Sequence, residues 1–85
     1  MARSPFRGKT IYPIYQGQDG ERMDFYFSKA HRCWKLRYQK PGQLMVVKLF
    51  DQGRSREADF LAADRRTAQE ARKRGMVFHH GELRA

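Results

Sequence analysis

Alternation of apolar and polar residues with a period of two, over residues 22–29 and again over residues 33–39, constrains the fold of this chain most. Such alternation is typical of strands with one buried and one solvated face. The side chains that it assigns to the core are Met23, Phe25, Phe27, Trp34, Leu36 and Tyr38. Pro41 and Gly42 stand in the turn after the second segment, and they predict a hairpin that continues into residues 44–50.

Three further strands are expected from the residue types. Residues 10–16 are rich in strand formers, and we place them at an edge of the sheet because Pro13 cannot donate a ladder hydrogen bond. Residues 44–50 are a more continuous apolar run, which favours a central strand covered on part of both faces. Residues 76–79 are a candidate for a short final strand.

Residues 55–74 allow two interpretations. One is a single helix over the whole segment; the other makes residues 56–62 a strand and starts the helix at Arg65. We favour the second, because the preceding Asp-Gln-Gly turn suits a hairpin and Asp64 is a good N-cap. In either case Gly75 is expected to end the helix.

The predicted architecture is an α+β fold: an antiparallel β-sheet of three to five strands with one C-terminal helix packed on one face. Ala68 and Ala71 would face the sheet and let the helix approach it closely. The chain has 85 residues, which indicates one small domain over residues 9–85. Residues 1–8 are basic and interrupted by proline and glycine, and they are expected to be a flexible arm.

Composition argues against several classes of protein. The longest apolar run has four residues, too few for a membrane-spanning helix, and the N-terminus lacks the apolar core of a secretion signal. Cys33 is the only cysteine, so the chain has no internal disulfide framework and we expect a cytoplasmic location. Neither His31 near Cys33 nor the pair His79–His80 has zinc-ligand spacing, and no phosphate-binding glycine loop is present. We therefore expect no metal, no cofactor and no enzymatic activity.

Positive charge is concentrated in parts of the chain. Lys and Arg number 18 against 9 Asp and Glu, which gives a net charge of +9. Residues 1–9, 29–48 and 65–75 carry +3, +6 and +4, whereas residues 10–28 and 49–64 each carry −2. A charge that serves only solubility is usually mixed in sign. The clustering therefore favours a polyanionic partner.

We expect nucleic acid to be bound by the polar stripe of the central hairpin and by the exposed face of the helix. A β-ribbon fits the DNA major groove, where Arg and Gln read base edges and Lys mainly contacts phosphate. The candidate residues are Arg32, Lys35, Arg37, Gln39, Lys40, Lys48, Arg65, Arg66, Arg72 and Lys73. A basic arm with Arg3 and Arg7 is a further candidate for the minor groove.

A purely structural explanation of the same cations stays open. Lys and Arg protect sheet edges from unwanted pairing, and cations in the last helical turn balance the helix dipole. The dipole does not account for Arg65 and Arg66, which would stand near the positive end of a helix that begins at Arg65. A basic N-terminal segment can likewise be an ordinary disordered terminus.

The hairpin from Trp34 to Gln43, with the sequence WKLRYQKPGQ, resembles the hairpin of the N-terminal arm-type DNA-binding domains of phage tyrosine recombinases (integrases). Residues 67–72 are similar to the Ala-Arg helix that follows the sheet in that family. The resemblance implies a three-stranded sheet that packs on one helix and docks on DNA. Gln43 stands where the family usually has a basic residue, and we expect no catalytic recombinase domain. The resemblance thus implies a DNA-binding module that does not cut or rejoin DNA.

Three functions follow as hypotheses. The leading one is a small, non-catalytic accessory protein of a phage or mobile element that binds nucleic acid, with duplex DNA favoured. The runner-up is a small inhibitor or interaction protein that docks on a host protein or ribonucleoprotein complex. The third is a catalytic toxin that depends on His31, His79, His80 or Tyr38. No membrane partner is expected, and open edge strands favour a homodimer.

Overall fold

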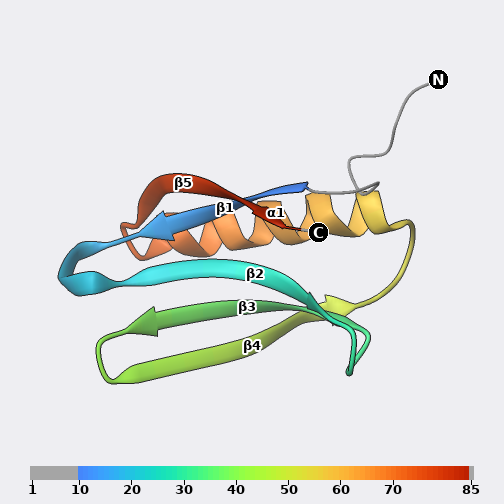
Figure 1. The fold of residues 1–85 in the computed structure, drawn as a ribbon, viewed down its shortest axis with the longest axis horizontal. Helices are drawn as coiled ribbons and strands as arrows, with labels where there is room; N and C mark the ends of the chain where they lie inside the picture. The colour runs from blue at the N-terminus through green and yellow to red at the C-terminus, as the bar shows by residue number, and fades with distance from the viewer. Residues whose placement is uncertain (1–9, 85) are drawn as a thin grey trace.

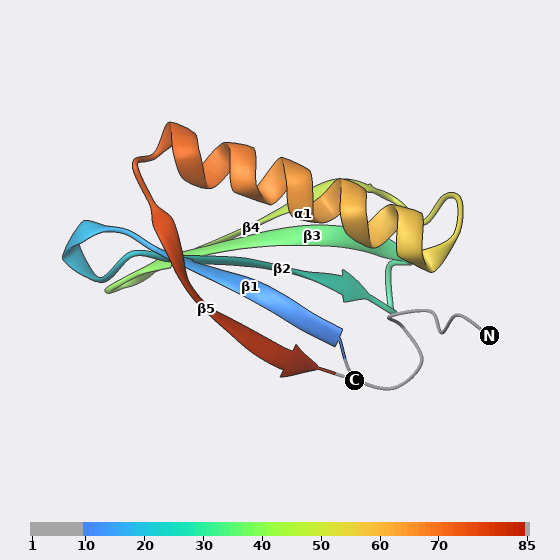
Figure 2. The same ribbon diagram turned by 90° about the horizontal axis from the view of Figure 1, so that it is seen from above.

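The computed structural model describes residues 10–84, which form one antiparallel sheet and one long helix (Figure 1). The elements are β1 (Thr10–Gln16), the short 3-10 helix η1 (Gln18–Gly20), β2 (Arg22–Ser28), β3 (Cys33–Lys40), β4 (Gln43–Asp51), α1 (Arg56–Lys73) and β5 (Val77–Arg84). The strands lie in the order β4-β3-β2-β1-β5, and every neighbouring pair is antiparallel. Figure 2 shows α1 along one side of this sheet. The predicted α+β fold is confirmed.

The core lies between α1 and strands β2 and β3. The period-two alternation places Phe25 and Trp34 under the helix, with 0% and 1% of their surfaces exposed. Phe60 packs on both rings, at centroid distances of 5.4 and 6.2 Å. Further along the helix, Ala71 packs in a second cluster with Met23, Leu36, Tyr38 and Met76. The small side chains of Ala63 and Ala71 let the helix lie close to the sheet.

The favoured interpretation of residues 56–62 as a strand is wrong, because α1 runs unbroken from Arg56 to Lys73. Ser55 caps the helix by accepting a hydrogen bond from the Ala58 N–H at 3.0 Å. The buried Asp59 carboxylate accepts the N–H groups of Gly53 and Arg54 at 3.0 and 3.3 Å. These bonds fold the preceding turn onto the helix start, so the chain enters a helix where hairpin chemistry was expected.

The predicted end of the helix at Gly75 agrees with the structure. Gly75 has φ +70°, a left-handed conformation that glycine adopts without steric cost. The Met76 N–H donates to the Ala71 carbonyl at 2.8 Å and closes the last turn. The chain then reverses directly into β5, which is longer than the four residues predicted for it.

Two strands exchange the places predicted for them. β4 was expected at the centre of the sheet but is an edge strand, with Leu44, Val46 and Val47 exposed by 60%, 40% and 42%. Leu44 and Val46 lie opposite Gln39 and Arg37 and share their open face, whereas Val47 lies opposite Leu36 on the helix side but outside both core clusters.

β1 was expected at an edge but lies between β2 and β5. Its pairing with β2 is confined to Tyr15–Met23 and Gln16–Arg22, so Pro13 lies beyond that ladder. On the other side Pro13 lies opposite Gly81 of β5. An interior strand therefore tolerates this proline because β1 and β2 separate before they reach it.

The predicted arm, residues 1–8, lies outside the residues that the structure describes. Within residues 10–84, no helix combines the length and the apolar character that crossing a bilayer requires.

Candidate nucleic-acid interface

The ten candidate residues are divided between the two faces of the sheet. Alternation on β3 turns Leu36 toward α1, and so turns Lys35 and Arg37 toward the opposite, open face. Gln39 continues this stripe. The candidates on α1 lie on the other side of the sheet, so a single flat ligand surface cannot contact both groups. The structure therefore separates Lys35, Arg37 and Gln39 from the helix candidates. Lys48 of β4 is the exception, because it lines one groove with Arg66 and Lys73.

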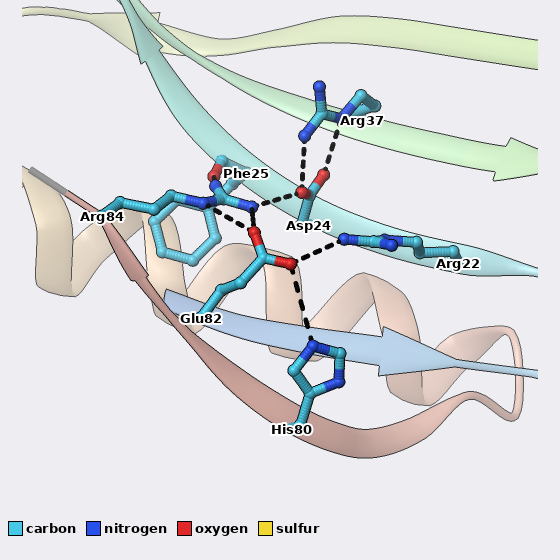
Figure 3. A network of polar contacts seen from close by, with 7 residues as sticks. All are labelled: Arg22, Asp24, Phe25, Arg37, His80, Glu82 and Arg84. Carbon is cyan, nitrogen blue, oxygen red and sulfur yellow. Dashed lines mark hydrogen bonds and ion pairs between the residues drawn. The ribbon is translucent and has the colours of Figure 1, made fainter. Parts of the chain in front are cut away.

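A network of buried and half-buried charges occupies the open face, centred on Asp24 of β2 (Figure 3). Asp24 is 1% exposed and receives two hydrogen bonds from Arg37, Nε to Oδ1 at 2.9 Å and Nη2 to Oδ2 at 2.7 Å. Arg84 of β5 donates a third, to Oδ2 at 2.8 Å, and also donates to the Phe25 carbonyl at 3.0 Å. The network thus bridges β2 and β5 where β1 diverges from β2.

Glu82 extends the same network along β5. Its carboxylate binds Arg22 at 3.0 Å and Arg84 at 3.0 Å, and it lies 3.8 Å from the His80 ring nitrogen Nε2. The hydrogen bond from Arg84 is the strongest influence on Glu82 and holds its pKa below the ordinary glutamate value. Three arginines therefore meet two carboxylates on the open face.

Two opposing effects act on the pKa of Asp24. Burial is the larger single effect and would raise it, but the hydrogen bonds and charges of Arg37 and Arg84 together outweigh burial and lower it. Asp24 stays ionised and holds both arginines. Arg37, a candidate for reading bases, is thereby committed to an ion pair that ties β2 to β3.

Sequence reasoning missed Asp24, Glu82 and Arg84 as partners of one another. Asp24 and Arg84 are 60 positions apart, and no local pattern connects them. The one available signal was Asp24 itself, an acidic residue opposite the basic stripe of the next predicted strand.

The remaining candidates on the hairpin are spread along its length. Lys35 contacts the Nδ1 atom of His31 at 2.8 Å. Lys48 lies opposite Lys35 and pairs with Asp51 at 2.7 Å, and this hydrogen bond raises the pKa of Lys48. The other three are exposed at the two ends of β3: Arg32 in the turn before it, and Gln39 and Lys40 at its end.

The helix candidates form a more coherent surface. At about 100° per residue, the four cations fall within an arc of about 120° on the side of α1 away from the core. They are Arg65, Arg66, Arg72 and Lys73, and all four are exposed. Among residues 10–84, none of the four forms an ion pair with a carboxylate; Glu70, which lies beside them, pairs with Arg74 at 3.3 Å. We call these four residues the helix cation face.

A groove of about 360 Å³ adjoins this face, between α1 and the edge strand β4. Arg66, Lys73 and Arg74 line its helix side, and Lys48 lines its strand side together with apolar residues of β4. Arg66 also donates to the Leu49 carbonyl at 2.6 Å, which holds its guanidinium over the groove. Gln69 and Glu70 also line the helix side, and the Glu70 carboxylate pairs with Arg74. The groove thus has apolar residues of β3 and β4 and an excess of cations over carboxylates, a charge that suits an anionic chain.

Other kinds of site find less support in the same part of the chain. Within residues 10–84 no group of three or more His, Cys, Asp or Glu side chains is arranged to hold a metal ion. Cys33 is buried, with 2% of its surface exposed, whereas His31 and His79 lie at the surface.

Comparison with protein-family models, with curated proteins and with solved structures finds no match to this chain. The geometry described above is therefore the basis for assigning a function.

Proposed function

We propose that this protein is a small, non-catalytic nucleic-acid-binding accessory protein of the kind used by phages and mobile elements. Duplex DNA is the favoured ligand, and the helix cation face with its adjoining groove is the favoured contact surface. The proposal is carried by one observation: four exposed cations lie side by side on α1, and no carboxylate among residues 10–84 pairs with them. The resemblance of the hairpin to recombinase arm-type domains is the reason for favouring duplex DNA over RNA.

The expected binding is mainly electrostatic. Lys and Arg side chains neutralise phosphates and release counterions, so affinity falls as salt rises. Four phosphate contacts correspond to a slope of about −3.6 in a plot of log affinity against log salt concentration. Arg37 is expected to contribute little, because Asp24 already neutralises it.

The experiment compares two variants that each lose three positive charges. Arg65→Gln/Arg72→Gln/Lys73→Gln removes most of the helix cation face, whereas Arg32→Gln/Lys35→Gln/Lys40→Gln removes the same charge from the hairpin. Affinity for a duplex is measured over a range of salt concentrations. The helix variant should flatten the salt slope by about 2.7, since three phosphate contacts are lost. The hairpin variant should flatten it much less.

Equal effects of the two variants would show that net charge, not the helix cation face, governs binding. A larger effect of the hairpin variant would move the interface to the open face of the sheet. Absence of duplex binding by the unmodified protein at low salt would remove the proposal.

A second candidate function, docking on another protein, is favoured by a different surface. Ile11 of β1 and Leu83 of β5 lie directly opposite each other and are 65% and 59% exposed. Val77 and Phe78, at the start of β5, are 67% and 60% exposed. Apolar side chains around an open edge strand are typical of surfaces that pair with a further protein chain.

This candidate includes the homodimer expected from the sequence and the small inhibitor that docks on a host protein. A stoichiometric protein complex that persists in about 0.5 M salt would favour it, because salt at that concentration screens exposed charges. The substitution Phe78→Ser should dissociate such a complex and leave the affinity for a DNA duplex unchanged.

A further inference from the structure

A second hollow, of about 360 Å³, lies at the opposite end of the sheet from the basic groove. Trp34 and Phe27 line it, with ring centroids 5.3 Å apart and ring planes inclined by 59°. Trp34 is almost fully buried and Phe27 is half-buried, so Phe27 presents part of its ring to solvent. The volume of this hollow lies at the lower end of the range of about 300–1,000 Å³ that small-ligand sites occupy.

Polar groups surround the aromatic pair. Lys29, in the turn after β2, and Arg56, in the first turn of α1, line the hollow together with Gln52. The carboxylate of Asp59 also lines it, but both of its oxygens already accept backbone N–H groups. Lys29 and Arg56 are the two cations of this lining, and Asp59 is its one carboxylate.

A smaller hollow of about 130 Å³ continues from the first around Phe27, Lys29 and Arg56. Tyr26 and Arg84 line its far side. Phe27, Lys29 and Arg56 therefore line both hollows, and further aromatic and basic side chains lie around them.

We propose that this site, which we call the aromatic pocket, binds a nucleotide. The base stacks on the exposed part of the Phe27 ring, the Gln52 amide hydrogen-bonds the base edge, and Lys29 and Arg56 hold the phosphate. The inference deepens the proposed function and rests on it, because a nucleic-acid strand is one source of such a nucleotide. An unstacked nucleotide of a bound strand and a free nucleoside monophosphate both carry the required base and phosphate. The pocket adds base stacking to the phosphate contacts of the helix cation face.

Trp34 makes the test direct, because it is the only tryptophan in the chain and it lines the aromatic pocket. The unmodified protein is titrated with AMP, and both Trp34 fluorescence and the NMR shifts of the Gln52, Gly53 and Arg54 amides are followed. We expect saturable changes in at least the amide shifts, with a dissociation constant of about 1 mM or below. Ribose 5-phosphate and adenosine, each lacking one half of the ligand, should bind at least fivefold more weakly, since stacking and phosphate contacts both contribute.

Two variants locate the binding site. Lys29→Gln removes an exposed cation without touching the core and should weaken AMP binding about fivefold or more. Phe27→Leu removes the stacking surface and should weaken it by a similar factor. The variant Arg65→Gln/Arg72→Gln/Lys73→Gln, which lies on the helix cation face, should bind AMP as the unmodified protein does.

Absence of saturable change up to about 10 mM AMP overturns the inference. An unchanged affinity of Lys29→Gln for AMP also overturns it. Equal affinities for ribose 5-phosphate and AMP overturn it too, because the site would then bind only the phosphate. A single-stranded oligonucleotide that competes with AMP, where a blunt duplex does not, identifies the unstacked nucleotide of a strand as the source. If AMP fails to bind but the salt-dependent duplex binding persists, the pocket is refuted and the proposed function stands.

Discussion

Replacing Asp24 by Asn tests whether the charge network on the open face holds the two halves of the sheet together. Asn has nearly the same shape but no charge, and its NH₂ group meets arginine donors where a carboxylate oxygen accepted them. Asp24 receives three charge-assisted hydrogen bonds, at 2.9, 2.7 and 2.8 Å, and is 1% exposed. The substitution leaves Arg37 and Arg84 without their shared buried partner.

The loss of stability in Asp24→Asn depends on how well water can solvate the two arginines once the carboxylate is gone. Removing one partner of a fully buried ion pair costs about 3–5 kcal/mol. The side chains of Arg37 and Arg84 are 36% and 21% exposed, so water compensates part of that loss. We therefore expect Asp24→Asn to lower the free energy of unfolding by about 2–3 kcal/mol. In a domain of this size that corresponds to a midpoint about 10–20 °C lower.

The pH dependence supplies a sharper readout. Because the folded-state pKa of Asp24 is lowered, its contribution is complete above the unfolded-state pKa and is lost as pH falls through the folded-state pKa. Urea unfolding of the two proteins should differ by a constant amount down to about pH 5, and the difference should shrink below about pH 4. Glu82→Gln, at a more exposed position, should cause a smaller loss.

Equal stability of Asp24→Asn and the unmodified protein at neutral pH would refute the reasoning. A difference that stays constant from about pH 6 to about pH 2.5 would also refute it, because the loss would then not arise from the charge of Asp24.

Two further substitutions test the helix. Thr67 is fully buried and its Oγ1 has no hydrogen-bond partner among the described residues, so Thr67→Val should raise the free energy of unfolding by about 1 kcal/mol; a lower value in urea unfolding would contradict this. Gly75 has φ +70°, so Gly75→Ala should lower the thermal midpoint, with a loss of about 1 kcal/mol. Gly53→Ala is its control, because φ of Gly53 is not positive and an added Cβ would lie 3.7 and 3.8 Å from its nearest neighbours, which is ordinary contact. Equal losses of stability in the two variants would contradict the conformational argument.

Much of the central hairpin was predictable because its signal is local. The alternation in β2 and β3 needs only neighbouring residues, and the turn with Pro41 and Gly42 needs only four. The start of α1 was not predictable in the same way. Asp59 caps the preceding turn only once that turn has folded back onto the helix, and Phe60 is a core residue only once Trp34 lies opposite it.

The candidate site shows the same division. The helix cation face follows from residue spacing alone, given a helix, and its cations are exposed as expected. The commitment of Arg37 to Asp24 and the aromatic pocket around Phe27 were not visible, because each joins segments that approach only in the folded chain.

Residue order alone thus determined which side chains alternate, where the helix ends and how unevenly positive charge is distributed along the chain. Tertiary structure decided that β4 is an edge, that β1 is interior, and that the two basic groups face opposite ways. The physical reason is that periodicity and turn chemistry act between neighbours in sequence, whereas strand order and ion pairing depend on which distant segments share one core. Arg84 reaches Asp24 across 60 positions of sequence only because β5 returns along β1.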